Sequence, residues 1–136
     1  MQLLFFSEIY PEPFLLSRIT TAILATDLTT YDSTLILADG IGEHYPYMLD
    51  VDTVDKKVYF ISSSHIYRVN FDGTGKQMVL ENSYPRDIAI DWIGRRIIWS
   101  SINQNNINIA GLDSSEKREL ISTWNPVYIA VEPIAG

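Results

Sequence analysis

The chain has 136 residues, no cysteine and a formal net charge of −7. A hydrophobic content of 46% is enough to bury the core of one modest domain, whereas the absence of cysteine excludes disulfides, thiolate metal sites and a cysteine nucleophile. The negative charge opposes binding to nucleic-acid phosphates and favours a basic protein surface as partner. Since charged residues interrupt the apolar stretches and the basic start of a secretory signal is missing, we expect no direct membrane insertion by this segment.

The first 44 residues contain a weak copy of a pattern that becomes clear further along the chain. Matching apolar residues lie 43 positions apart, and the pairs are Ile23 with Ile66, Leu28 with Phe71, and residues 35–37 with residues 78–80. The Asp-Gly turn of the later copy is missing at the corresponding position of this segment. We therefore interpret residues 1–44 as a weak first unit.

Residues 45–83 and 84–125 repeat one pattern more clearly. Each unit begins with a proline, Pro46 or Pro85, that is followed six positions later by an aspartate. A third copy begins at Pro126 and reaches the acid Glu132 at the same distance. Pro46 and Pro85 are 39 positions apart, and Pro85 and Pro126 are 41 apart. A period near 40 residues with strand-like content is typical of a repeat architecture.

Within each unit, short apolar runs alternate with turn residues. In the second unit the runs cover residues 88–90, 96–100, 107–112 and 118–122, and Gly, Asn, Asp and Ser separate them. In the first unit, the Asp72-Gly73 pair is a sharper hairpin signal, because glycine readily adopts the positive φ that a tight turn needs. No segment has the sustained spacing of a helix. We predict four antiparallel strands in each unit.

Four-stranded units of about 40 residues match the blades of a β-propeller. We therefore predict an all-β fold, a partial β-propeller of roughly three four-stranded antiparallel blades, with residues 126–136 as the start of a further repeat. The opening prolines fit the start of an innermost strand, where a missing N–H removes no ladder hydrogen bond. Because a single blade leaves its apolar faces open, we expect the partners to include the remaining blades of a longer parent, or identical chains that self-associate.

The most specific pattern lies in residues 85–101 and 106–113. It consists of the proline phrase, an Asp-Trp-Ile-Gly-Arg run over residues 91–95, an aromatic residue in the next strand and a Leu-Asp turn. This order resembles the YWTD repeat, or LDL-receptor class B repeat, of the LDL receptor and its related proteins, the EGF precursor and nidogen. The resemblance covers residues 45–136 and extends more weakly over 1–44. It implies a six-bladed propeller that holds protein ligands on one rim and lies in the extracellular part of a membrane receptor.

The sequence departs from the family at the tetrad that gives the repeat its name. Residues 59–62 read Tyr-Phe-Ile-Ser and residues 98–101 read Ile-Trp-Ser-Ser, so serine replaces the family's aspartate in both copies. An ionised carboxylate at this place would make strong hydrogen bonds between blades. Asp52, Asp91 and Glu132 could supply acceptors in its stead.

No group of residues predicts catalysis, a cofactor or a metal site. His44 and His65 are the only two histidines, and neither has the spacing of a metal ligand. Asp50 and Asp52 look like a carboxylate pair, but the Asp52 position recurs in the later copies and so indicates architecture. We expect the chain not to be an enzyme.

Strand topology indicates where a ligand would bind. In an up-and-down blade, the loop that enters the innermost strand and the loop between the second and third strands lie on one face, which we call the rim. Tyrosine, tryptophan and arginine are enriched at protein-binding hot spots, and the rim collects such residues. The candidate ligand-binding residues are Tyr45, Tyr47, Ser64, His65, Tyr84, Arg86, Asn103, Asn105, Trp124 and Asn125. The alternative is that these aromatics only pack over the blade ends. On the opposite face, Trp92 is interpreted as a packing residue.

Two kinds of parent protein fit the resemblance. The first is an endocytic or Wnt co-receptor type protein related to the low-density lipoprotein receptor, in which this segment binds an extracellular protein ligand. The alternative is a nidogen-like extracellular matrix protein, in which the propeller is an assembly module. Because the family's propeller has six blades, we expect the chain to be a fragment of such a protein.

Overall fold

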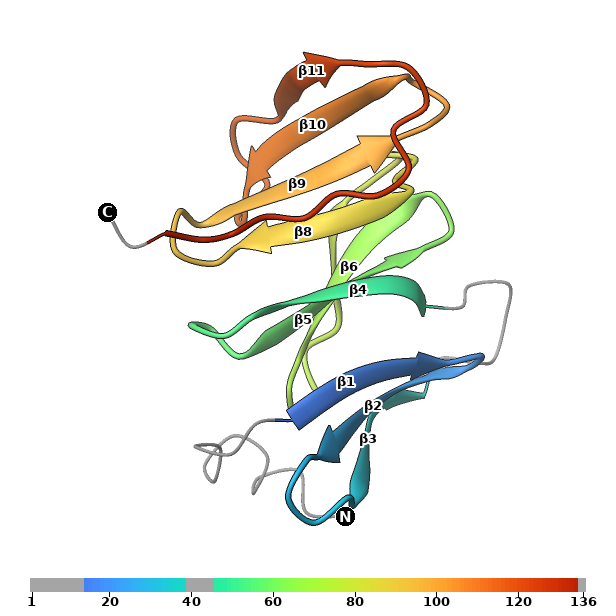
Figure 1. Ribbon diagram of the computed structural model, residues 1–136, viewed down its shortest axis with the longest axis vertical. Coiled ribbons are helices and arrows are strands. Elements are labelled where there is room, and N and C mark those ends of the chain that lie inside the picture. Colours follow the sequence, from blue (N-terminus) through green and yellow to red (C-terminus); the bar gives the residue numbers. More distant parts are fainter. Residues whose placement is uncertain (1–13, 39–45, 135–136) are drawn as a thin grey trace.

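The computed structural model describes residues 14–38 and 46–134. These residues form antiparallel strands grouped into three sheets, which are stacked along the long axis of the molecule (Figure 1). The first sheet contains β1 (Phe14–Ile19), β2 (Ala22–Asp27) and β3 (Ser33–Ala38), in that order. The residues before β1 lie outside the described part of the chain.

The second and third sheets have four strands each. The second contains β4 (Pro46–Asp52), β5 (Lys57–Ser62), β6 (His65–Asn70) and β7 (Gln77–Leu80). The third contains β8 (Asp87–Asp91), β9 (Arg96–Ser101), β10 (Asn106–Gly111) and β11 (Arg118–Ser122). Strands consecutive in sequence are neighbours in each sheet, as predicted for an up-and-down blade. The predicted all-β fold of roughly three blades is confirmed, with three rather than four strands described in the first.

The turns follow the predicted chemistry. Gly73 has a φ of 82° and donates its N–H to the carbonyl of Asn70 at 2.8 Å. Asp72 Oδ1 accepts the N–H of Thr74 at 2.9 Å, and Asp113 Oδ1 accepts that of Ser115 at 3.0 Å in the corresponding turn. An aspartate that binds the backbone two residues later stabilises a turn. The two β-hairpins are therefore closed by the same device at equivalent places.

Two apolar layers lie between the sheets, and residues of the innermost strands contribute to both. In the layer between the first and second sheets, Leu49 and Val51 of β4 pack with a buried cluster that includes Phe60 and Ile23. In the layer between the second and third sheets, the buried residues are Tyr59, Ile61, Ile66, Leu80, Ile88, Ile90, Ile97, Trp99, Ala110 and Leu112. Leu49 and Val51 thus pack towards the first sheet, whereas Tyr47 and Met48 of the same strand pack in the layer with the third sheet.

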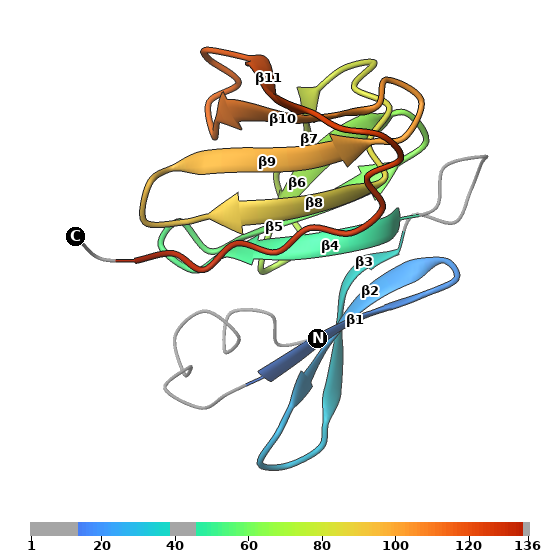
Figure 2. The same ribbon diagram turned by 45° about the horizontal axis from the view of Figure 1, so that its top comes forward.

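Two aspartates, the half-buried Asp50 and the buried Asp87, also connect neighbouring innermost strands. Asp50 of β4 accepts the N–H of Ile90 in β8 at 2.7 Å. Asp87 of β8 in turn accepts the N–H of Ile129 at 2.8 Å. Figures 1 and 2 show the result, with β4, β8 and the segment after Pro126 lying side by side.

Of the carboxylates expected to replace the missing tetrad aspartate, Asp52 therefore does so and Asp91 does not. Asp52 does bind across the sheets, since both of its oxygens accept from Arg95 of the third sheet, at 2.9 and 2.8 Å. Asp91 instead pairs with Arg96 within its own hairpin. The serines at the tetrad position, Ser62 and Ser101, are buried, and their hydroxyls have no hydrogen-bond partner among the described residues.

The end of the described chain is extended but unpaired. Residues 126–134 run along β8, and Ser100 Oγ donates to the carbonyl of Val127 at 3.3 Å. They belong to no sheet, because the described residues contain no strand that would pair with them. The division of the chain into units at residues 45, 84 and 126 stays a prediction. Within residues 14–38 and 46–134, no helix is long and apolar enough to cross a membrane.

Candidate ligand-binding rim

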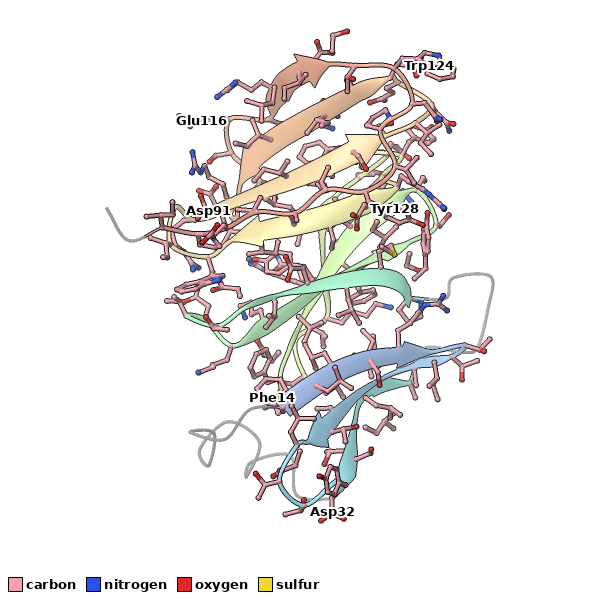
Figure 3. All side chains as sticks on the ribbon, in the orientation of Figure 1. Phe14, Asp32, Asp91, Glu116, Trp124 and Tyr128 are labelled. Carbon is pink, nitrogen blue, oxygen red and sulfur yellow. The ribbon has the colours of Figure 1, made fainter. Side chains whose placement is uncertain are left out.

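The rim is the edge of the stacked sheets where β8 begins and β9 ends. Figure 3 shows Trp124 and Tyr128 on this side, whereas Asp91 and Glu116 lie on the opposite side. The strand directions produce this separation, because antiparallel neighbours place alternate loops at opposite ends. Loops from the second and third sheets therefore meet at one edge, and so do their side chains.

Arg86 lies at the centre of the rim, between tyrosines that come from neighbouring units. Its Nη1 donates to the hydroxyl of Tyr47 at 3.2 Å, and its guanidinium carbon lies 5.9 Å from the centroid of the Tyr47 ring. The hydroxyl of Tyr128 interacts with the same guanidinium, and the hydrogen bond with Tyr47 is the main reason why the pKa of Arg86 is raised. Arg86 is thus a fixed cation at every physiological pH.

The backbone of Arg86 is fixed as well. Its N–H donates to the carbonyl of Ser100 at 2.8 Å, which ties the start of the innermost strand to β9. By contrast, Nε of the side chain is buried and has no partner among residues 14–38 and 46–134. A buried donor without a partner is costly and unusual. The guanidinium is therefore held with one donor nitrogen, Nε, buried and without a partner among the described residues.

Exposed aromatic rings lie on the same edge of the sheets as Arg86. Tyr84 is 47% exposed, Tyr128 is 73% exposed and Trp124 is 83% exposed. Such rings offer large contact areas at a small cost in conformational entropy. The sequence analysis identified Tyr84 and Trp124 but missed Tyr128, whose signal was its place two residues after the repeated Pro126. For Tyr84 and Trp124, the observed exposure argues against the alternative that they only pack over blade ends.

Four other rim residues hold loops in place. The carbonyl of Ser64 accepts the N–H groups of Ser83 and Tyr84, at 2.9 and 3.1 Å, and Nδ1 of His65 accepts that of Asn82 at 2.9 Å.

In the next repeat, Asn105 alone accepts both kinds of hydrogen bond, one through its backbone carbonyl and one through its side chain. Its carbonyl accepts the N–H of Thr123 at 3.0 Å, and its side-chain oxygen accepts that of Asn125 at 3.1 Å. The loop after each outermost strand is thus clamped to the loop between the second and third strands. Ser64, His65, Asn105 and Asn125 support the rim through these bonds.

Two of the predicted rim residues remain, Asn103 and Tyr45. Asn103 is exposed in the loop between β9 and β10. Tyr45 lies outside the described residues. The structure therefore brings Tyr47 and Arg86 into direct contact, places the missed Tyr128 close enough to contribute to the raised pKa of Arg86, and leaves Tyr84 and Trp124 exposed in loops of the same edge.

The opposite face contains a cleft of about 610 Å³, but its charged groups are largely paired. Arg95 binds Asp52 and Asp55, and Arg96 binds Asp91. Trp92 packs against the core between the second and third sheets, as the sequence indicated. Among residues 14–38 and 46–134, no group of three or more His, Asp or Glu side chains is placed to hold a metal ion.

Comparisons with known proteins show which proteins this chain resembles. No family model matches the chain. The chain is 36% identical over 77 residues to nidogen from Drosophila melanogaster, which covers 54% of this chain and 6% of that protein. A chain in the crystal structure of a nidogen/laminin complex matches with 27% identity and a TM-score of 0.77, over 88% of this chain and 49% of that one. The chain thus resembles a YWTD-type propeller segment, and it is similar to nidogen in both sequence and fold.

A second relative extends the comparison to receptors. The low-density lipoprotein receptor-related protein 5-like protein from Homo sapiens is 31% identical over 75 residues, 52% of this chain and 30% of that protein. A TolB protein from Agrobacterium tumefaciens, at 16% identity and a TM-score of 0.59, shares the fold alone. The chain spans less than a third of either curated relative and about half of the solved nidogen/laminin chain.

Proposed function

We propose that this YWTD segment is a non-enzymatic module of an extracellular protein and that it binds a protein ligand on the rim. The observation that carries the proposal is the guanidinium of Arg86, which is held by Tyr47 on an edge with the exposed rings of Tyr84 and Tyr128. Arginine and aromatic side chains dominate the binding energy of protein interfaces. The exposed rings of Tyr84 and Trp124 provide apolar contact area on the same edge.

The chemistry of the anchor indicates what the ligand presents. A guanidinium binds carboxylates best, because its donors match the two oxygens in one plane. We therefore infer that a carboxylate of the ligand approaches Arg86 and that apolar side chains pack on the neighbouring rings. The net charge of −7 describes the whole chain and favours a basic partner surface, whereas Arg86 sets a local preference of opposite sign at the contact itself.

Two kinds of parent protein are compatible with this proposal. Nidogen gives a slightly higher identity than the receptor-related protein and supplies the most extensive structural match reported above. A matrix assembly module is accordingly the better supported parent, and an endocytic or signalling receptor is the second candidate. In both forms the rim carries the ligand, and the segment acts outside the cell.

Laminin is the probe for this proposal, because the matched nidogen structure is a complex with laminin. In the full-length protein that carries this segment, we expect Arg86→Ala to weaken binding to immobilised laminin by at least about tenfold, the usual cost of losing a charged anchor. Tyr84→Ala combined with Arg86→Ala should weaken it further. Surface plasmon resonance measures both variants.

Arg118→Ala is the matched control, because it removes the same charge from the exposed outermost strand β11. Its affinity for laminin should equal that of the wild-type protein. Unchanged binding by Arg86→Ala would contradict the rim assignment. If the wild-type protein fails to bind laminin, the matrix parent is wrong and the receptor form stands in its place.

A further inference from the structure

Tyr128 is exposed on the rim, yet the backbone on both sides of it is fixed. Its side chain is 73% exposed. The carbonyl of Val127, the residue before it, accepts a hydrogen bond from Ser100 Oγ at 3.3 Å. The N–H of Ile129, the residue after it, donates to Asp87 Oδ2 at 2.8 Å. The place of the ring is therefore set by two side chains that lie on other strands.

These two side chains form one unit, which we call the Tyr128 clamp. Asp87 of β8 and Ser100 of β9 are register partners in the third sheet. Asp87 is 7% exposed and Ser100 is completely buried. The N–H of Ile88 donates to Asp87 Oδ1 at 2.9 Å, which fixes the orientation of the carboxylate. A site is held most accurately when its supporting residues lie on paired strands and are themselves fixed by packing and hydrogen bonds.

Ser100 also connects the Tyr128 clamp with Arg86. Its hydroxyl donates to Val127, and its carbonyl accepts the N–H of Arg86 at 2.8 Å. The hydroxyl of Tyr128 lies close enough to the guanidinium to contribute to the raised pKa of Arg86. One buried residue thus holds the backbone of the arginine and the backbone beside the tyrosine.

The boundary between the second and third sheets shows which part of the clamp belongs to the general architecture. There Asp50 Oδ2 accepts the N–H of Ile90 at 2.7 Å, although β8 is already paired with β9. An aspartate bond of this kind therefore does not depend on a strand that lacks a neighbour in its own sheet. Ile61, which lies 39 positions before Ser100, has no hydroxyl and packs in the apolar layer. Of these two boundaries, only the one with Tyr128 has the serine bond.

We propose that Asp87 and Ser100 are positioning residues of the rim, which hold Tyr128 beside Arg86 so that its ring contacts the ligand. The positioning stands on the two hydrogen bonds. The contact with a ligand rests on the function proposed above. Because both positioning residues are buried, they act on the ligand only through Tyr128.

Hydrogen exchange of the full-length protein without a ligand tests the positioning. In Asp87→Ala the N–H of Ile129 loses its acceptor, so protection of the peptide over residues 127–130 should fall by about fivefold to tenfold, the effect of losing one hydrogen bond. The loop at residues 123–125 is held by Asn105 instead, and its unchanged protection controls for loss of the fold. Equal protection of residues 127–130 in the variant and in the wild-type protein would overturn the role of Asp87.

A pair of serine variants tests the other half of the clamp with less risk to the fold. Ser100→Ala removes the hydroxyl and keeps the carbonyl that binds Arg86, so protection of residues 127–130 should fall by about twofold to threefold, because the lost bond is long. Ser101→Ala is the matched control, since it removes a neighbouring buried hydroxyl that has no partner among the described residues. Its protection should equal that of the wild-type protein. Equal losses in the two variants would overturn the role of Ser100.

Surface plasmon resonance on immobilised laminin tests the contact with the ligand. Tyr128→Ala should weaken binding by about tenfold, as expected for an aromatic contact at an interface, and Asp87→Ala by about threefold, because it loosens the ring without removing it. The variant with both substitutions should bind as weakly as Tyr128→Ala alone, since Asp87 acts through Tyr128. Losses that multiply in the double variant would overturn the proposal, because Asp87 would then act by another route.

The two proposals fail in different ways. If Asp87→Ala releases residues 127–130 but Tyr128→Ala and Arg86→Ala both bind laminin like the wild-type protein, the positioning stands and the function proposed for the rim is wrong. If Arg86→Ala weakens binding and Tyr128→Ala does not, the rim stands and the contact between Tyr128 and the ligand is wrong.

Discussion

The second and third sheets share one strand pattern, yet their equivalent residues have different contacts. The sheet of β4–β7 has another sheet against each face, whereas the sheet of β8–β11 has one sheet on one side and only the segment after Pro126 on the other. Asp52 is completely buried and binds Arg95 of the next sheet. Its equivalent Asp91 pairs within its own hairpin.

This difference shows that a repeat specifies the strands, whereas the neighbouring repeat specifies the contacts. Val58, Phe60 and Val69 of the second sheet are buried towards the first sheet. In the third sheet, every residue of β11 is exposed. The stability of the segment should therefore be concentrated in the two layers between sheets, as in other repeat proteins whose units contact only their neighbours.

The largest expected effect comes from the two tryptophans. Trp99 is 1% exposed in the layer between the second and third sheets, whereas Trp124 is 83% exposed on the rim. Trp99→Ala should lower the free energy of unfolding of the intact propeller by about 3–5 kcal/mol, because it leaves a large cavity. Trp124→Ala should change it by less than about 0.5 kcal/mol. Urea unfolding of the propeller measures both, and equal losses would contradict the stated position of the layer.

The next largest difference in unfolding free energy is expected between alanine variants of the two arginines that follow Gly94. Arg95→Ala leaves the buried carboxylate of Asp52 without its cation. Because the Arg95 side chain is 38% exposed and Asp52 keeps its bonds to two backbone N–H groups, we expect a loss of about 2 kcal/mol. Arg96→Ala removes a pair whose arginine is 54% exposed and should cost less than about 1 kcal/mol.

The same unfolding measurement compares these variants. If Arg96→Ala proves to be the more damaging, then the contact between sheets matters less for stability than the contact within the hairpin, and the comparison fails.

The smallest effect is a dependence on pH, with opposite signs for two aspartates. Burial raises the pKa of Asp50, although bonds from backbone N–H groups oppose this. The N–H of Gly94, followed by Arg96, lowers the pKa of Asp91. A group whose pKa is raised in the folded protein contributes stability that is present below its unfolded pKa and is lost as the pH rises. A group whose pKa is lowered contributes stability that is present above its unfolded pKa and is lost as the pH falls.

Between pH 3 and pH 6, therefore, Asp91→Asn should flatten the rise of the unfolding free energy with pH, and Asp50→Asn should steepen it. A series of urea unfolding midpoints across this range gives the two slopes. Slopes that change in the same direction for both variants would refute the assignment of these shifts to burial and to the hairpin contacts.

Much of the fold could be predicted from the sequence, because local chemistry determines it. The Asp72-Gly73 pair identified a hairpin that the structure contains, and the phrase after each proline identified β4 and β8. The role of Asp50 could not be predicted, because its partner Ile90 lies 40 positions away and the register of β4 includes an irregularity between Pro46 and Leu49. Contacts between sheets depend on how the repeats stack.

The candidate site was predicted to a smaller extent. Strand topology placed Tyr47 and Arg86 on one face, and the structure shows that they touch. Composition could not distinguish Arg86, whose guanidinium contacts Tyr47 across two units, from His65, whose ring nitrogen accepts a loop N–H. Tyr128 was missed, because only its contact with Arg86 separates it from other exposed tyrosines.

The central claim is that a ligand binds on the rim, and hydrogen exchange of the full-length protein with and without laminin tests it most directly. The account predicts that laminin slows exchange over residues 82–86 and 123–128. The turns at residues 53–56 and 92–95, on the opposite face, should exchange at unchanged rates. Protection of those two turns with none on the rim would contradict the account.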